Sequence, residues 1–385
     1  MLRHEGKAGY GLFSETNMMR LYKRIFYLGI IYLAFGILLE VGLRFLPVQE
    51  SMGWLPVNEG SPIRRFEPNR SFTWSKNWNL SLVNQLKSNN YGFISTIDYD
   101  PSSDIPLTAV IGDSYIEAPM VKQTRTAVAV LNTEFQNRRR FYAFGASGAQ
   151  LSTYIAYAKY AKEEFRPDHY VFLLIGNDFD ESLSLYGGDG PGFHYFVEDT
   201  AGGLTLKRID YEVSLLKKTL RKSALFMYIN MNLQVGSRLR IVWTRMQDTF
   251  SGRETEYVGQ TSANVDSHHE ADSKRAVDAF FKMLENACGV PRKNILIGID
   301  GMRPHLYNPA DLMKAEESYF SDMRKYVLFK ARMLGHPVID MQPVFVKDYA
   351  VNKMFFEYPQ YDEGHWNERA HELFARQIID SGFLD

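Results

Sequence analysis

Residues 110–115, Val-Ile-Gly-Asp-Ser-Tyr, decide the fold, because here an apolar run stops abruptly on a short polar turn that carries a serine. The run begins at Leu107, and its length and composition are typical of a central strand in a parallel sheet. Ser114 by itself is more typical of a helix N-cap. It is a candidate nucleophile only if the chain also supplies a base, an orienting acid and an oxyanion site.

Three further motifs supply these groups in order along the chain. Residues 145–148, Gly-Ala-Ser-Gly, follow a second apolar run, and residues 176–178, Gly-Asn-Asp, close a third. Residues 362–365, Asp-Glu-Gly-His, precede the last predicted helix. Ligand sites of open parallel sheets form at the carboxyl ends of the strands, so we expect all four motifs to meet at one edge of the sheet.

Short apolar runs alternate with segments of helical spacing over most of the chain. They predict strands at 107–112, 141–144, 170–175, 294–300 and 337–340, and helices at 124–137, 153–165, 274–287, 311–334 and 367–379. This alternation predicts an α/β fold, a three-layer α/β/α doubly wound parallel sheet of flavodoxin-like type. Asn367 is placed to cap the last helix.

The four motifs resemble those of the SGNH or GDSL hydrolases, a family named after blocks that carry Ser, Gly, Asn and His. The matching positions are Ser114, Gly148, Asn177 and His365. The resemblance covers about residues 107–180 and residues 295 to the C-terminus. It implies an acyl-ester hydrolase or O-acyltransferase with the α/β/α fold, of the membrane-anchored bacterial type.

Two details of the motifs differ from the family pattern. The first block ends in Tyr115 instead of Leu, and the third lacks the spacer that many members carry between Gly176 and Asn177. Neither difference removes a reacting group, so both bear on the subfamily more than on the chemistry.

The motifs assign a role to each catalytic group. Ser114 is the candidate nucleophile, and His365 is the candidate base, because the pKa of an imidazole lies near neutrality. Asp362, three residues earlier, can hold that imidazole in its working tautomer. Asp113 and Asp178 are expected to support the turns by accepting hydrogen bonds and not to react.

The oxyanion site needs donors where negative charge develops. The resemblance implies the backbone N–H groups of Ser114 and Gly148 and the side-chain amide of Asn177. Glycine at 148 lets the backbone approach a ligand closely, and an asparagine donates without adding charge. No cofactor and no metal is expected to take part.

Composition narrows the function classes. The chain has 44 Lys and Arg against 45 Asp and Glu, a net charge of -1, which gives no basic field for nucleic acid. Cys288 is the only cysteine, which excludes an intrachain disulfide and a Cys-rich metal site. The 385 residues can bury one substantial core and an additional subdomain.

Residues 25–46 are apolar except for Glu40 and Arg44 and are long enough to cross a bilayer as a helix. Three basic residues precede them: Arg20, Lys23 and Arg24. The positive-inside rule therefore predicts a single-pass inner-membrane protein with a cytoplasmic N-terminus and a periplasmic catalytic domain. A cleavable signal peptide and a buried core helix are the alternatives, but no small-x-small site follows and residues 25–39 have no polar stripe.

The chain is predicted to divide into a cytoplasmic segment (1–24), the anchor (25–46), an extended lead-in (47–106) and a catalytic domain (107–385) with an insertion at about 187–271. The lead-in carries aromatic residues that we expect to pack on the domain: Trp54, Phe66, Phe72, Trp74 and Trp78. The insertion is predicted to contain one basic, aromatic helix over residues 211–245.

Three other features of the sequence could have a function, but a structural explanation is more common for each of them. Residues 268–270, His-His-Glu, suggest a metal, but no other ligand accompanies them and a polar loop is expected there. His371 is expected to be a surface or packing histidine. The basic run at 217–222 could contact anionic lipid or polysaccharide, although a solvated face beside a packing face is more common.

The sequence leaves several functions open. Hydrolysis and transfer to a carbohydrate share one acyl-enzyme, so the residues do not separate them. The family association suggests acylated cell-envelope or exported polysaccharide as substrate and the envelope polysaccharide machinery as partner. A catalytically silent carbohydrate-binding or assembly protein of the same fold is an alternative, as is a lipase or lysophospholipase if the insertion forms an apolar lid.

Overall fold

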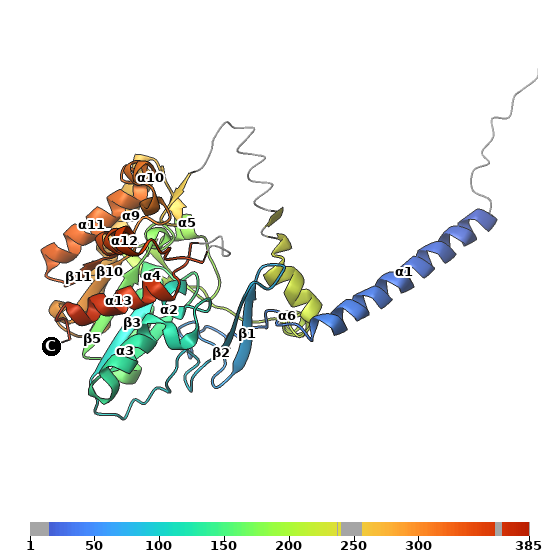
Figure 1. Cartoon of the computed structure of the whole chain (residues 1–385), viewed down its shortest axis with the longest axis horizontal. Helices are drawn as coiled ribbons and strands as arrows, with labels where there is room; N and C mark the ends of the chain where they lie inside the picture. Colours follow the sequence, from blue (N-terminus) through green and yellow to red (C-terminus); the bar gives the residue numbers. More distant parts are fainter. Residues whose placement is uncertain (1–14, 237, 240–255, 359–363, 385) are drawn as a thin grey trace, which may run out of the picture.

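The structure is a computed structural model, and it describes residues 15–236, 238–239, 256–358 and 364–384. An α/β domain carries the sheet, and a long helix, α1 (Glu15–Leu43), extends away from it (Figure 1). The predicted fold class is confirmed in both parts, the parallel sheet and the apolar N-terminal helix.

The central sheet has five strands, all parallel, in the order β11-β10-β5-β3-β4. Their bounds are β3 (Leu107–Gly112), β4 (Arg140–Gly145), β5 (His169–Leu174), β10 (Ile295–Ile299) and β11 (Val338–Asp340). In the register, Val110 lies opposite Ala143 on β4 and Val171 on β5. The chain leaves β3 toward β4 and returns to the other side of β3 with β5, which is the flavodoxin-like order.

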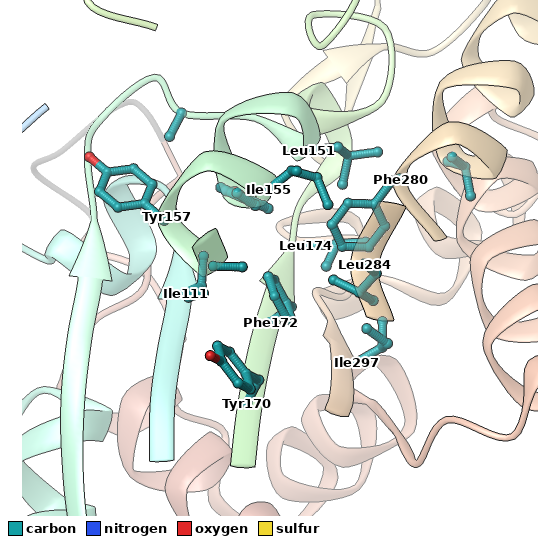
Figure 2. Packing of buried hydrophobic residues seen from close by; sticks show 14 of the residues in the cluster. Ile111, Leu151, Ile155, Tyr157, Tyr170, Phe172, Leu174, Phe280, Leu284 and Ile297 are labelled. Atoms are coloured by element: carbon teal, nitrogen blue, oxygen red, sulfur yellow. The ribbon is translucent and has the colours of Figure 1, made fainter. Parts of the chain in front are cut away.

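Helices cover both faces of this sheet. One face packs against α4 (Leu151–Phe165), α9 (Ser267–Cys288) and α11 (Tyr319–Leu334), and the other against α3 (Ala127–Phe135), α12 (Met341–Asn352) and α13 (Glu368–Asp380). Alternate residues of each strand enter opposite cores, so Ile111 and Phe172 meet Ile155 and Phe280 (Figure 2), whereas Val110 faces the other side. Asn367 caps α13 as predicted, accepting from two backbone N–H groups.

Several predicted helices differ from those observed. α9 begins at Ser267, not at 274, because Asp266 caps it by accepting from the backbone of His268 and His269. Residues 268–270 therefore form the first turn of a helix, and the predicted polar loop is wrong. The helix predicted at 311–334 is two helices, α10 (Pro309–Ala315) and α11, because Ser318 caps the second. α12 has no counterpart among the predicted elements.

The lead-in contains more regular structure than expected. β1 (Ser71–Lys76) and β2 (Leu82–Lys87) form an antiparallel hairpin. Phe66, Phe72 and Trp74 are buried in a small core. This core also contains Ala118, Met120 and Val121, which follow the motif that carries Ser114. Trp78 at the hairpin tip is 64% exposed, so its predicted packing is wrong.

The insertion and the residues just before it are built of short pieces. They are α5 (Ser184–Gly187), β6 (His194–Glu198), β7 (Leu204–Arg208), α6 (Leu215–Leu220), α7 (Ala224–Met227), a π-helical turn (Tyr228–Asn232), β8 (Tyr257–Val258) and β9 (Thr261–Ser262). The single helix predicted at 211–245 is wrong in its described part, because Ser214 and Ser223 each cap a separate short helix. Residues 237 and 240–255 lie outside the described residues.

The apolar helix predicted at residues 25–46 is present with shifted ends. α1 begins ten residues before position 25 and ends at Leu43, three before position 46. Met18–Leu43 are apolar enough to cross a membrane, with a mean hydropathy of 2.1 over the best window and no residue of that window buried by the protein. A signal sequence near an N-terminus would have the same length and composition.

Candidate active site

Ser114 lies at the carboxyl end of β3, at the first residue of the short helix α2 (Ser114–Glu117). Its Oγ lies 2.8 Å from Nε2 of His365, a residue that comes just before α13. Both side chains are buried, at 7% and 8% exposure. The structure therefore brings the predicted nucleophile and the predicted base into hydrogen-bonding contact, although 251 positions separate them.

Asp113 caps the turn that presents Ser114. Its Oδ1 accepts from the backbone N–H of Tyr115 at 2.9 Å, and its Oδ2 lies 2.9 Å from Oγ of Ser114. Burial raises the pKa of the Asp113 carboxyl to about 7. A group that stabilises a turn by accepting hydrogen bonds fits the supporting role predicted for this residue.

The site lies where the strand order reverses, between β3 and β5. Gly145 and Gly148, on the turn after β4, border it from one side. A Cβ at Gly145 would lie 2.4 Å from the backbone nitrogen of Glu117, so the two turns can approach only with glycine at this position. Gly148 has a φ of +83°, which favours glycine, and is exposed, so its N–H is placed on an accessible turn.

Asn177 lies on the turn that follows β5, on the opposite side of β3 from the turn that follows β4. Its Nδ2 donates to Oε2 of Glu181 at 2.9 Å, which fixes the direction of the amide and leaves its second N–H for another acceptor. Asp178 is fully buried and accepts from the backbone of Ile175 and from the hydroxyl of Tyr154. Burial raises the pKa of Asp178 well above its usual value, and the Asp113 charge adds to this.

Aromatic side chains hold the imidazole of His365. The ring of Tyr115 stacks on it at 5.1 Å between centroids, and the ring of Trp366 packs edge-on against Tyr115. Trp366 is fully buried, and its Nε1 donates to Oδ1 of Asp300 at 2.9 Å. The Trp-Asn pair after the histidine therefore anchors the loop that carries His365.

A buried ion pair that the sequence reasoning missed supports the same loop. Arg303 and Asp300 pair at 2.5 Å, with side chains 2% and 4% exposed. Nη1 of Arg303 donates to the carbonyl of Gly364 at 2.8 Å, and Nη2 to the hydroxyl of Tyr115 at 3.2 Å. The only sequence signal was the position of Asp300 as the last residue of a predicted strand, at the edge where the four motifs meet.

Glu117, at the end of α2, is a second residue that the sequence reasoning missed. Its Oε2 accepts from both the backbone and the hydroxyl of Ser147, which ties α2 to the turn that carries Gly148. Burial raises the pKa of Glu117 to about 7, and the nearby Arg64 opposes that shift. Glu117 therefore couples the turn that carries Ser114 to the turn that carries Gly148.

The insertion reaches the site through the hairpin of β8 and β9. The carbonyl of Gly259 would lie 2.0 Å from a Cβ at Gly176, so the hairpin tip packs directly against the turn that carries Asn177. Nε2 of Gln260 would lie 3.5 Å from a Cβ at Gly364. The tip thus lies beside both the Asn177 turn and the His365 loop. Asp362 lies outside the described residues, so its role stays a prediction.

The other histidines that the sequence singled out have structural partners. His269 contacts Asp180 at 2.9 Å, and His268 contacts Asp272 at 3.1 Å. His371 is fully buried against Trp366 and accepts from the backbone of Ala127, which makes it a packing histidine. In the described part of the chain, no group of three or more His, Cys, Asp or Glu side chains could hold a metal ion.

No family model matches the chain, and no curated protein matches it by sequence. Solved structures do match. A lipolytic protein of the G-D-S-L family from Veillonella parvula is 12% identical, covers 72% of this chain and 97% of its own, and has a TM-score of 0.35. The chain is similar to G-D-S-L enzymes and esterases.

Two esterases are among the other matches. A two-domain esterase active on acetylated mannans is 12% identical over 74% of this chain and 50% of its own, with a TM-score of 0.35. A catalytic mutant of an acetylxylan esterase from Geobacillus stearothermophilus is 12% identical over 71% and 93%, with a TM-score of 0.33. Because these identities and TM-scores are low, the case for an activity rests on the geometry around Ser114.

Proposed function

We propose that this chain is a serine-dependent acyl-ester hydrolase or O-acyltransferase that works through an acyl-enzyme. Oγ of Ser114 attacks the ester carbonyl carbon while its proton moves to Nε2 of His365. The tetrahedral intermediate then expels the alcohol, which takes that proton from His365. Water or a sugar hydroxyl attacks the acyl-enzyme in the same way and releases Ser114.

The observation that carries this proposal is the 2.8 Å contact between Ser114 and His365 at the switch point of the sheet. A serine that served only as a helix cap would need no imidazole, and the Oγ–Nε2 distance is that of a nucleophile and its base. The same contact argues against a silent binding protein, because such a protein has no use for a buried Ser–His pair.

The oxyanion donors and the orienting acid complete the proposed site. We assign the oxyanion site to the backbone N–H groups of Ser114 and Gly148 and to the second N–H of the Asn177 amide, which lie on the turns after β3, β4 and β5. Asp362 is assigned to Nδ1 of His365. The proposed mechanism uses no metal and no cofactor.

Acyl transfer is a second candidate, and the position of the insertion favours it. The hairpin tip at Gly259 and Gln260 packs against the Asn177 turn and near the His365 loop. A cover at this place limits the access of water to the acyl-enzyme, which is the condition for transfer to a sugar hydroxyl. Acylated cell-envelope or exported polysaccharide is the substrate class that we propose, with the envelope polysaccharide machinery as partner.

We place the protein in the inner membrane. In this proposal residues 1–24 are cytoplasmic, 25–46 form the anchor and 47–106 the lead-in, and the catalytic domain (107–385, insertion at about 187–271) is periplasmic. The basic residues before the apolar helix support this orientation. Retention of α1 in the mature protein distinguishes an anchor from a signal sequence.

Labelling with a fluorophosphonate tests the proposal. We expect mass spectrometry to find one adduct, on Ser114, and Ser114→Ala to lose both the adduct and the hydrolysis of a small acetyl ester. Ser184→Ala is the matched control, since the hydroxyl of Ser184 donates to Asp189 on the insertion. An unlabelled but folded parent protein would favour the silent binding protein. Acetyl transfer assayed with and without an oligosaccharide acceptor then separates transfer from hydrolysis.

A further inference from the structure

The apolar helix α1 is fastened to the insertion by one acidic side chain. Glu40 accepts hydrogen bonds from the hydroxyl of Ser223 at 2.7 Å and from the backbone N–H groups of Ala224 and Leu225 at 3.1 and 2.9 Å. These donors belong to the first turn of α7. The start of α7 therefore lies beside α1, about one helical turn before α1 ends at Leu43, as Figure 1 shows for this part of the chain.

This contact sets the depth of the insertion relative to a membrane. The 26 residues Met18–Leu43 extend for about 39 Å, which exceeds the roughly 30 Å of a hydrocarbon core. The basic residues up to Arg24 occupy one headgroup layer, so Leu43 reaches the other. Glu40 lies three residues, about 4.5 Å, before Leu43, so the first turn of α7 lies where the hydrocarbon core meets those headgroups.

Large apolar side chains are exposed at this level. Leu215 and Leu216 on α6 are 81% and 68% exposed, and Phe45, just after α1, is 83% exposed. Trp78 lies near α7, because its carbonyl accepts from the hydroxyl of Tyr228 in the turn that follows α7. A solvated helix beside a packing face would bury its leucines, and these are not buried. Exposed leucines and a tryptophan are typical of a helix that lies in the membrane interface.

Cations accompany these apolar groups. α6 and the residues after it carry Lys217, Lys218, Arg221 and Lys222. A cavity of about 450 Å³ opens between the end of α1, the start of β1 and α7. Four cationic side chains and one carboxylate line it: Arg44, Arg70, Arg221, Lys222 and Glu50. Arg44 pairs with Glu40 and Arg70 with Glu67. Arg221 and Lys222 form no ion pair with any described residue, and Nη1 of Arg221 donates to the hydroxyl of Tyr211 at 3.3 Å.

We propose that α6 and this cavity dock the domain on the bilayer that α1 crosses, with the cavity holding the phosphate of an anionic phospholipid. The apolar side chains of Leu215 and Leu216 enter the interface, and Arg221 and Lys222 bind the phosphate, for which a guanidinium offers a matching fork. The inference rests on α1 being retained as an anchor, and it is independent of the chemistry at Ser114. Its consequence is a fixed orientation of the active-site edge relative to the membrane.

Fluorescence of the full-length chain in lipid nanodiscs tests the docking. In a Cys288→Ala background, Leu216→Cys carries an environment-sensitive label, and Met333→Cys on α11 is the matched control, because Met333 is also an exposed apolar residue on a helix, at 57%. We expect brominated lipids to quench the label at 216 but not at 333, and more strongly with phosphatidylglycerol than with phosphatidylcholine alone. Bromine is carried only by the lipid, so quenching reports contact of the label with lipid.

Charge variants identify the source of the docking. Arg221→Gln with Lys222→Gln should shift the equilibrium away from the immersed state by roughly twenty-five-fold, since each basic residue near an anionic surface contributes about 1 kcal/mol, which is about fivefold. Lys217→Gln with Lys218→Gln, at exposed positions, should shift it in the same direction without altering the cavity. Added salt should weaken the membrane docking of the parent protein in the same way.

Equal quenching at 216 and 333 would overturn the proposal. Quenching at 216 that does not change with lipid charge or with any of the four lysine and arginine substitutions would also overturn it. Retention of the protein in the nanodisc fraction tests the anchor separately. A protein that stays in the nanodisc but shows no immersion at 216 therefore refutes the docking and leaves the anchor and the esterase proposal intact.

Discussion

Oγ of Ser114 lies 2.9 Å from Oδ2 of Asp113 and is also within reach of His365. A serine hydroxyl has one proton, so it donates either to the carboxylate or to the imidazole, but not to both. Because burial raises the pKa of Asp113 to about 7, a neutral Asp113 can donate to Oγ near neutrality and leave the serine proton to His365. In the proposed mechanism the neighbouring acid thereby supports the nucleophile without acting as its base.

Asp113→Asn tests this division of roles. The asparagine keeps an oxygen for the backbone N–H of Tyr115, and its amide donates to Ser114, so we expect the rate of fluorophosphonate labelling to remain close to that of the parent. His365→Ala should lose roughly a hundredfold to ten-thousandfold, the usual contribution of a general base. Equal losses in the two variants would make Asp113 a reacting group.

The second prediction concerns Asp362 and His365. If Asp362 holds the imidazole in its working tautomer, Asp362→Asn should depress the acylation rate by a large factor, and His365→Ala by at least as much. The double variant should be scarcely slower than His365→Ala, because groups that act as one unit fail together. Stopped-flow acylation with a chromogenic ester measures all three. Losses that multiply would show that the two residues act independently.

Asn177→Ala should behave differently from these variants. It removes one oxyanion donor, which costs roughly a hundredfold to a thousandfold in turnover, while the Ser–His pair still reacts with a fluorophosphonate. Glu181→Gln is the matched control, since glutamine keeps an oxygen for Nδ2 of Asn177. Turnover of Asn177→Ala within a few-fold of the parent would remove this residue from the oxyanion site.

The positions of the site motifs could be predicted because they depend on local patterns. Each of Ser114, Gly148 and Asn177 follows a short apolar run, and strands of that kind end at one edge of a parallel sheet. Asn367 as a cap followed from residue preference alone. For these elements the periodicity of apolar residues and a turn or capping residue predict the same boundary, and the structure has a boundary there.

The rest depends on contacts between distant segments. The pairing of Arg303 with Asp300 matters because it reaches Tyr115 and Gly364, and no local pattern indicates such partners. The single basic, aromatic helix predicted at 211–245 is wrong in its described part, since Ser223 starts a new helix against Glu40. The spacing of apolar residues along the chain does not predict whether α1 or a membrane covers a given side chain.

Membrane topology gives a fourth prediction. The basic cluster before residue 25 predicts that protease added to intact spheroplasts digests the chain after Pro47 and spares a short N-terminal tag. Opening the inner membrane with detergent should expose the tag as well, which serves as the control. A protected catalytic domain would reverse the orientation, and a full-length chain that is soluble without detergent would remove the anchor.

The last prediction uses the buried carboxyl of Glu117. Burial raises its pKa from 4.5 to about 7, so between these values the native state keeps a proton that the unfolded chain has released. The contribution of Glu117 to the free energy of unfolding is therefore greatest below pH 4.5 and falls as the pH rises through 7. The change corresponds to about 3 kcal/mol, because one pKa unit is 1.36 kcal/mol.

Glu117→Gln removes this titration while leaving an oxygen that can accept from the backbone N–H of Ser147. Urea unfolding at pH 5 and pH 8 should show the parent losing stability relative to the variant by up to about 3 kcal/mol as the pH rises. Glu163→Gln, at an exposed position of α4, should run parallel to the parent across the same range. A Glu117→Gln curve that also runs parallel to the parent would mean that Glu117 is charged at both pH values. Its hydrogen bonds from Ser147 would then suffice to keep it ionised in the core, and the turn that carries Gly148 would be held by a charge.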